Sequence, residues 1–246
     1  MSTLVSVVIP TFNRYLYLLN AVNSVLNQSF KNFQIIVIND GSTQEEYYKY
    51  SLPKGVKQIN LKQNQKEING FSSDAIRNFG IEVAESKYVA FLDDDDIWLE
   101  NKLESQIDAM SKGRSNFSST DGFVGHGIYN KKKNYKICNK EYYYKLISRK
   151  YKNTEFVEKK LFSKKFYYPE KFNSRFINIH NCIITSSVVV ETNLIKQVGM
   201  FDKALPNGKG DYDCWKKILK HSECTYVAEP LIYYDLSHGD GQNYKD

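Results

Sequence analysis

The residues of this 246-residue sequence that most clearly suggest chemistry are four consecutive aspartates after an apolar run: Asp93, Asp94, Asp95 and Asp96. Carboxylates this close repel one another and raise each other's pKa. A fold tolerates such a cluster where a cation neutralises it, and Mg²⁺ or Mn²⁺ prefers carboxylate and diphosphate oxygens together. We therefore expect Mn²⁺ or Mg²⁺ as a cofactor here. An exposed acidic turn that caps the next helix is the alternative.

Two further polar loops occupy equivalent places in the sequence. Residues 10–14 and 39–42 each follow a short run rich in β-branched residues, as the aspartates do. The three runs are residues 5–9, 34–38 and 88–92. In open α/β sheets ligands bind outside the carboxyl ends of the strands, so the three loops predict one shared site. On its own evidence Asp40 is only a turn residue, because Asn-Asp-Gly-Ser favours a turn.

Apolar residues at helical spacing separate these runs. The expected helices are residues 16–26, 73–84 and 97–110, and residues 56–61 read as one more strand. Alternating strands and helices predict right-handed βαβ units and an α/β fold, with a Rossmann-like, mostly parallel sheet flanked by helices. The second half is less regular. There we expect strands at 122–129, 181–190 and 226–234, and helices at 191–198 and 211–221.

The net charge of +6 is concentrated in residues 131–175. This segment holds 15 Lys and Arg against 4 Asp and Glu, a net charge of +11, with seven tyrosines and four phenylalanines. A basic and aromatic segment can face an anionic membrane, a nucleic acid or an anionic acceptor. A solvated lysine-rich insertion is the plainer alternative. Of the three partners we expect the membrane or the acceptor, and no nucleic acid.

The four cysteines show no C-x-x-C spacing, which favours reduced thiols in a cytoplasmic protein. Met1 leads directly into a strand-like run, so no signal peptide is expected at this start. No segment approaches the ~18 apolar residues of a membrane span. We expect a cytoplasmic protein, attached at most peripherally to the inner face of the cell membrane.

Taken in order along the chain, several short segments make the sequence resemble the family 2 glycosyltransferases, which have the GT-A fold. Any one segment is weak evidence, whereas this many in the right order are strong evidence. In the first half they are residues 8–14 (VIPTFNR), 37–42 (VINDGS), 75–81 (AIRNFGI) and 91–98 (FLDDDDIW). In the second half they are residues 185–188 (TSSV), 198–202 (VGMFD), 210–215 (GDYDCW) and 229–234 (EPLIYY).

The resemblance implies roles for single residues in binding a nucleotide-sugar donor. Asp93 to Asp95 match the D-x-D motif of the family, in a register that four aspartates leave open by one position. Asp94 would approach the ribose, while Asp95 with Asp93 would hold the metal, and His238 is a further metal ligand in some relatives. The other donor-binding residues implied are Pro10, Thr11, Phe12, Arg14, Asp40 and Arg77. Relatives often carry Tyr in place of Phe12.

The resemblance also implies a catalytic base. An acceptor hydroxyl must lose its proton as it attacks, and a carboxylate within reach can take it. Asp211 is the candidate and Asp213 the runner-up; on a helix these two do not share one face. Relatives often carry Glu where Gly210 stands. The implied activity is inverting transfer of a hexosyl or N-acetylhexosaminyl group. The donor would be a UDP-sugar, and the acceptor a glycan or lipid-linked glycan, in bacterial surface polysaccharide assembly.

Two alternatives stay open. A sugar-nucleotide pyrophosphorylase would carry a Gly-rich loop after its first strand, but this chain has no glycine before Gly41. A non-catalytic, carbohydrate-binding protein on the same fold remains, since a fold does not fix a function. We expect one continuous domain, in which residues 1–112 bind the donor and residues 113–246 face the acceptor and supply the base.

Overall fold

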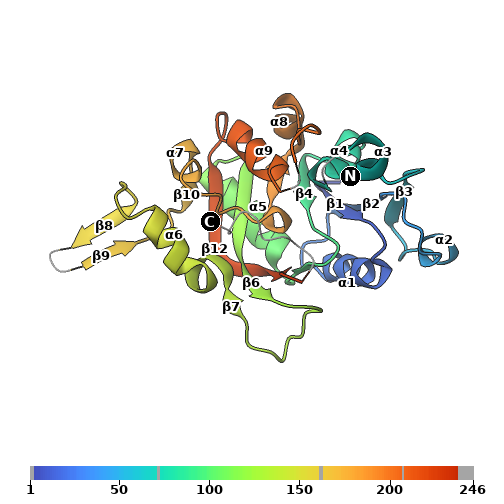
Figure 1. Cartoon of the computed structure of the whole chain (residues 1–246), viewed down its shortest axis with the longest axis horizontal. Coiled ribbons are helices and arrows are strands. Elements are labelled where there is room, and N and C mark those ends of the chain that lie inside the picture. The colour runs from blue at the N-terminus through green and yellow to red at the C-terminus, as the bar shows by residue number, and fades with distance from the viewer. Residues whose placement is uncertain (1–2, 71–72, 161–162, 207, 238–246) are drawn as a thin grey trace.

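A mixed β-sheet runs through the molecule and carries helices on both faces (Figure 1). The computed structural model describes residues 3–70, 73–160, 163–206 and 208–237. Within these residues the sheet has ten strands. They are β1 (Val5–Thr11), β2 (Phe33–Asn39), β3 (Val56–Asn60), β4 (Tyr88–Phe91), β5 (Ile97–Trp98), β6 (Phe117–Gly125), β7 (Lys136–Ile137), β10 (Lys171–Phe172), β11 (Val189–Glu191) and β12 (Cys224–Asp235).

The strand order places the first half of the chain beside the second in one continuous sheet. It is β10-β12-β6-β11-β4-β1-β2-β3, with β5 paired to β12 and β7 to β6. Strand β1 lies parallel to β2 and β4, and β2 lies parallel to β3. Strand β11 is antiparallel to both of its neighbours and joins the two halves of the sheet. The α/β expectation of a mostly parallel sheet flanked by helices is confirmed, and the carboxyl ends of β1, β2 and β4 share one edge.

Alternating side chains of β1 pack into two separate hydrophobic cores, one on each face of the sheet. Val7 packs with helices α1 (Tyr15–Leu26) and α5 (Lys102–Gly113) on one face. Val8 packs on the other face with α4 (Ser73–Glu82), α8 (Thr192–Gln197) and α9 (Gly210–Ile218). Continuous apolar strands are the pattern expected when helices cover both faces of a sheet. The shorter helices are α2 (Glu46–Lys49), α3 (Gln65–Asn69), α6 (Tyr144–Lys150) and α7 (Ser174–Ile177).

Three of the expected elements are wrong in part. The strand predicted at residues 122–129 is β6, which begins at Phe117 and ends at Gly125. The helix predicted at residues 97–110 begins only at Lys102, because Ile97 and Trp98 pair with β12 as a short strand. Of the strand predicted at residues 181–190, only 189–190 pair, at the start of β11. Residues 185–187 form a 3-10 turn instead, in which Val188 N donates to Thr185 O. Apolar composition alone does not distinguish such a buried turn from a strand.

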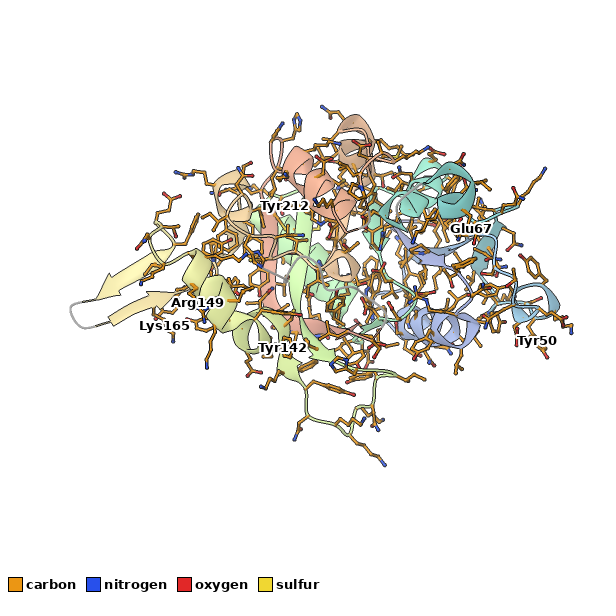
Figure 2. All side chains as sticks on the ribbon, viewed as in Figure 1. Tyr50, Glu67, Tyr142, Arg149, Lys165 and Tyr212 are labelled. Carbon is orange, nitrogen blue, oxygen red and sulfur yellow. The ribbon has the colours of Figure 1, made fainter. Side chains whose placement is uncertain are left out.

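The basic segment, residues 131–175, does not form one surface. Its first lysines lie on the loop between β6 and β7, which projects separately from the hairpin of β8 (Val157–Lys160) and β9 (Ser163–Phe166) (Figure 1). Figure 2 shows Arg149 and Lys165 on the hairpin side, far along the molecule from Tyr50 and Glu67. Residues 161–162 of the segment lie outside the described part. Among the helices of the described residues, none combines the length and apolarity needed to cross a membrane.

Gly80 allows α4 to lie directly against β1, and this contact gives a stability prediction. A Cβ at Gly80 would stand 2.4 Å from Val8 Cγ1, inside van der Waals contact with a fully buried side chain. We expect Gly80→Ala to destabilise the fold by ~1–3 kcal/mol through overpacking, despite the better helix propensity of alanine. Thermal unfolding measures this. Glu82→Ala, at the exposed end of the same helix, is the control, and equal melting temperatures for the two variants would contradict the close contact.

Candidate active site

The loops that follow β1 and β2 are bound to each other at the carboxyl edge of the sheet. Thr11 Oγ1 lies 2.6 Å from Tyr47 Oη. Asn13 Oδ1 accepts from Thr43 N at 2.7 Å, and Asn13 N donates to Ser42 Oγ at 2.9 Å. Asn13 adopts a left-handed conformation with φ of 53°, which asparagine tolerates better than most residues. The two loops therefore form one preformed wall of the site.

Asp40 stands in this wall, where it also holds the start of α3. Its Oδ1 accepts from Gln65 N and its Oδ2 from Asn64 Nδ2, both at 3.0 Å. Burial raises the pKa of Asp40 to about 6, although the Gln65 N–H lowers it. The neighbouring Gly41 has φ of +70°, and a Cβ there would stand 2.4 Å from the backbone of Gln63. Asp40 thus has a structural task in addition to the donor contact that the family resemblance implies for it.

Arg14 links the first loop to the aspartates after β4. Its guanidinium lies 2.6 Å from Asp95 Oδ2 and 3.4 Å from Asp94 Oδ1. Pro10 and Phe12 are half-buried on the same loop. Burial raises the pKa of Asp94, and so does Asp95, while Arg14 lowers it. Asp94 Oδ2 is buried and has no hydrogen-bond partner among the described residues. It can therefore still coordinate a cation or accept a hydrogen bond from a hydroxyl.

Arg77 connects the aspartates to α9 on the other side of β4. It is 4% exposed, and it forms ion pairs with Asp93 and, at 3.3 Å, with Asp74. Asp74 Oδ2 in turn accepts from Gly210 N at 3.2 Å. Burial opposes the charge of Arg77, but the two carboxylates raise its pKa. That Arg77 lies near the nucleotide stays a prediction; in the structure its guanidinium is buried between Asp93 and Asp74.

Asp74 is a residue of this site that the sequence interpretation missed. It lies at the start of α4, where an acidic residue is the usual partner of a helix N-terminus. Only its spacing of three residues from Arg77 could have suggested an ion pair. Nothing in the sequence pairs it with Gly210, 136 residues away.

The fourth aspartate fixes the shape of the turn. Asp96 is fully buried, and its Oδ1 accepts from Asp235 N at the end of β12, at 2.8 Å. Ser186 Oγ accepts from Asp93 N at 3.0 Å, and Ser186 O accepts from Trp98 Nε1 at 2.7 Å. Trp98 is therefore a core residue. Burial and the neighbouring aspartates raise the pKa of Asp96. The other three aspartates, Asp93 to Asp95, are the ones that face Arg14 and Arg77.

The two candidate bases on α9 have different surroundings. Asp211 is 5% exposed, and its Oδ2 accepts from Thr185 Oγ1 at 3.3 Å. Burial, together with the charge of Asp74, raises the pKa of Asp211 to about 7. Asp213 instead forms an ion pair with Lys217 at 2.6 Å, one turn along the helix. Asp211 is thus the carboxylate joined to the buried charges of the site.

The side chains at the aspartate turn fit a divalent cation of a particular kind. Within the described ranges, no three His, Cys, Asp or Glu side chains are arranged as a complete metal site. Asp93, Asp94 and Asp95 offer neighbouring carboxylates that pair with Arg14 or Arg77, and Asp94 also has an unpartnered oxygen. Mg²⁺ is commonly held by one or two carboxylates together with substrate phosphates. The turn therefore fits a cation whose shell a diphosphate completes. His238 lies outside the described residues.

Curated relatives of this chain are glycosyltransferases. An uncharacterized glycosyltransferase of Rickettsia typhi is 32% identical over 232 residues, which cover 94% of this chain and 63% of the relative. The Escherichia coli protein WfgD is a UDP-Glc:alpha-D-GlcNAc-diphosphoundecaprenol beta-1,3-glucosyltransferase. It is 33% identical over 114 residues, covering 46% of this chain and 44% of WfgD. The chain thus spans less than two thirds of the length of either relative.

Solved structures show the same fold. The crystal structure of residues 1–349 of Staphylococcus aureus TarS in complex with UDP-GlcNAc aligns with a TM-score of 0.64 and 19% sequence identity. The alignment covers 99% of this chain and 61% of the TarS chain. At this level of identity the likeness shows the fold alone.

The family model for glycosyl transferase family 2 matches residues 6–191 of the chain. The matched range contains the loops after β1 and β2, Arg77 and the aspartate turn, and it ends before Asp211. The match therefore covers most of the chain, including the range that holds the carboxylates facing Arg14 and Arg77. Together with the fold, this match shows that the chain belongs to glycosyltransferase family 2 and has the GT-A fold.

Proposed function

We propose that this chain is an inverting, metal-dependent glycosyltransferase. It moves a hexosyl or N-acetylhexosaminyl group from a UDP-sugar to a hydroxyl of a glycan or lipid-linked glycan, in bacterial surface polysaccharide assembly. The observation that carries the proposal is the buried chain of charges from Asp93 through Arg77 and Asp74 to Gly210, beside Asp211. The names of WfgD, which uses UDP-Glc, and of the TarS complexes with UDP-GlcNAc and UDP support the donor class.

The donor occupies the carboxyl edge of the sheet in this proposal. The uracil base of the donor lies against the wall formed by Pro10, Thr11, Phe12 and Asp40, with Asp94 toward the ribose. Arg14 offers a guanidinium fork to the diphosphate, a geometry suited to phosphate oxygens. Asp95 and Asp93 would hold Mn²⁺ or Mg²⁺, which neutralises the charge that grows on the departing diphosphate.

Asp211 performs the proton transfer in this proposal. The acceptor hydroxyl gives its proton to the carboxylate as its oxygen attacks the anomeric carbon. The bond from the sugar to UDP breaks as the new glycosidic bond forms on the opposite face, so the anomeric configuration inverts. In the transition state of this displacement the sugar is oxocarbenium-like, as in glycoside hydrolysis. A buried carboxylate with a pKa of about 7 is well matched to accepting a proton near neutral pH.

The first prediction of the proposed function separates the two carboxylates of α9. Asp211→Asn should lower turnover by roughly 10²–10⁴-fold and leave donor affinity intact, because general-base help is lost while the donor wall is untouched. Initial rates and calorimetric titration with UDP measure the two quantities. Asp213→Asn is the matched control on the same helix and should retain activity. An active Asp211→Asn protein beside an inactive Asp213→Asn protein would assign the base to Asp213.

The second prediction concerns the cation. Asp95→Ala should abolish transfer and weaken Mn²⁺ binding in the presence of UDP, while the protein stays folded because one source of repulsion is removed. Calorimetry with Mn²⁺ and UDP reads binding without relying on activity. Asp108→Ala, an exposed aspartate on α5, is the control. Full activity of the Asp95 variant, or indifference of the wild type to a chelator, would contradict metal dependence.

We further propose that the basic segment attaches the enzyme to an anionic membrane face, where a lipid-linked acceptor would lie. Each Lys or Arg near such a surface contributes ~1 kcal/mol, and aromatic rings settle at the headgroup level. Because the segment forms two separate projections, each one can be tested alone. An anionic acceptor held directly by these lysines is the competing account.

The third prediction follows from this attachment. Co-sedimentation with phosphatidylglycerol vesicles should weaken as salt rises. It should also weaken in each of two variants, Lys131→Gln/Lys132→Gln/Lys133→Gln on the β6–β7 loop and Lys159→Gln/Lys160→Gln/Lys164→Gln/Lys165→Gln on the hairpin. Lys54→Gln/Lys57→Gln/Lys62→Gln, outside the segment, is the control. No vesicle binding even at low salt would exclude the membrane and favour the acceptor.

A further inference from the structure

A cavity of about 550 Å³ lies on the α1 face of the sheet. Its walls come from α1, from β5 and Glu100, and from the loop between β6 and β7. Asp211 belongs to α9, which covers the opposite face, so this cavity is separate from the proposed base. Ile97 lines it and follows the aspartate turn directly. The cavity therefore lies next to the aspartate turn, on the face opposite Asp211.

Three asparagine amides face this cavity, two from α1 and one, Asn27, from the residue that caps its C-terminus. Asn20, Asn23 and Asn27 recur at spacings of three and four residues, so they share one side of the helix. Among the described residues none of the three side chains has a hydrogen-bond partner, and Asn23 and Asn27 are exposed. Each amide offers two donor hydrogens and an acceptor oxygen. Helix α1 carries no charged side chain, so this face is polar and neutral.

The opposite wall is aromatic and held in place. The ring of Tyr129 stacks on Tyr135 at 5.6 Å and lies 5.2 Å from Tyr233. Tyr233 in turn donates to Gly127 O at 2.7 Å, which ties the loop to β12. Ile128, 49% exposed, adds apolar surface beside Tyr129. A ring fixed by its neighbours can pack against the apolar face of a ligand with little loss of side-chain freedom.

The charge of the cavity excludes some ligands. Glu100 is the charged residue among those that line it. A phosphate or a nucleotide would meet a carboxylate and no cation there. Clustered amides with an aromatic wall instead suit a neutral ligand that has many hydroxyls and a flat apolar face, which is the chemistry of a sugar ring.

We propose that this cavity binds a neutral oligosaccharide, namely a stretch of the acceptor glycan that lies beyond the sugar receiving the transfer. Its identification as acceptor rests on the proposed function, whereas saccharide binding itself requires no donor and no transfer. The cavity would hold the growing chain on the α1 face while its end reaches the aspartate turn.

Binding of two neutral tetrasaccharides, cellotetraose and chitotetraose, tests the proposal by saturation-transfer difference NMR on the full chain without donor. We expect at least one of them to bind at millimolar concentration. Affinity should fall about tenfold in Asn23→Leu/Asn27→Leu, because the hydrogen bonds of two amides to sugar hydroxyls are lost. Leucine has the higher helix propensity, so α1 is retained. Tyr129→Ala should weaken binding as well.

Asn153→Leu is the control, since Asn153 is an exposed asparagine remote in sequence from the cavity-lining residues. Its affinity should equal that of the wild type. The proposal is overturned if neither tetrasaccharide binds, or if the double variant binds as tightly as the control. Calorimetry with UDP on the same proteins keeps the two proposals distinguishable. If the wild type does not bind UDP, the proposed function is contradicted, while the saccharide result is unaffected.

Discussion

The buried guanidinium of Arg77 is the interaction on which the rest of the site depends. A charge that is 4% exposed is costly to bury unless it is paired, and Arg77 is paired with Asp93 on the aspartate turn and with Asp74 at the start of α4. Through Asp74 the same charge reaches the backbone of Gly210, where α9 begins. The arginine thereby sets the position of the aspartate turn and of the helix that carries Asp211 relative to one another. Removing it would leave the buried Asp74 and the partly buried Asp93 without their cation.

Much of the framework could be predicted from local sequence, whereas the pairing inside the site could not. The runs that form β1, β2 and β4 are apolar on both faces, and this pattern is specific enough to place three polar loops at one edge. The short strand β5 was hidden, because two residues that pair with a distant strand leave no periodicity. Lys102 shows the same limit. At a helix start it would be read as solvated, yet it is fully buried over the ring of Trp98, where burial lowers its pKa. Asp74 was missed for the same reason, because its partner Gly210 is far away in sequence.

In the proposals, the two faces of the sheet have different functions: proton transfer on one and binding of the acceptor chain on the other. On the α4 and α9 face, buried ion pairs hold charged groups in fixed positions, which suits chemistry in which charge develops and a proton moves. On the α1 face, neutral amides and stacked tyrosines form a cavity without cations, which suits a bulky uncharged ligand. The aspartate turn stands between them, because Arg14 at the start of α1 and Arg77 on α4 approach it from the two faces. Donor, acceptor chain and base would then meet at one turn of the backbone.

The central claim is that the buried charges beside Asp211 tune it to act as a base, and a pH–rate profile tests this most directly. Burial and Asp74 raise the pKa of Asp211 to about 7, and the base acts in its deprotonated form. The kcat/KM of the wild type should therefore rise as the pH rises through about 7 and level off above it, since this profile reports the free enzyme. In Asp74→Asn the negative charge that raises the pKa is gone, so the midpoint should move to lower pH. A midpoint that stays unchanged in Asp74→Asn, or a wild-type rate that falls as the pH rises through 7, would contradict the account.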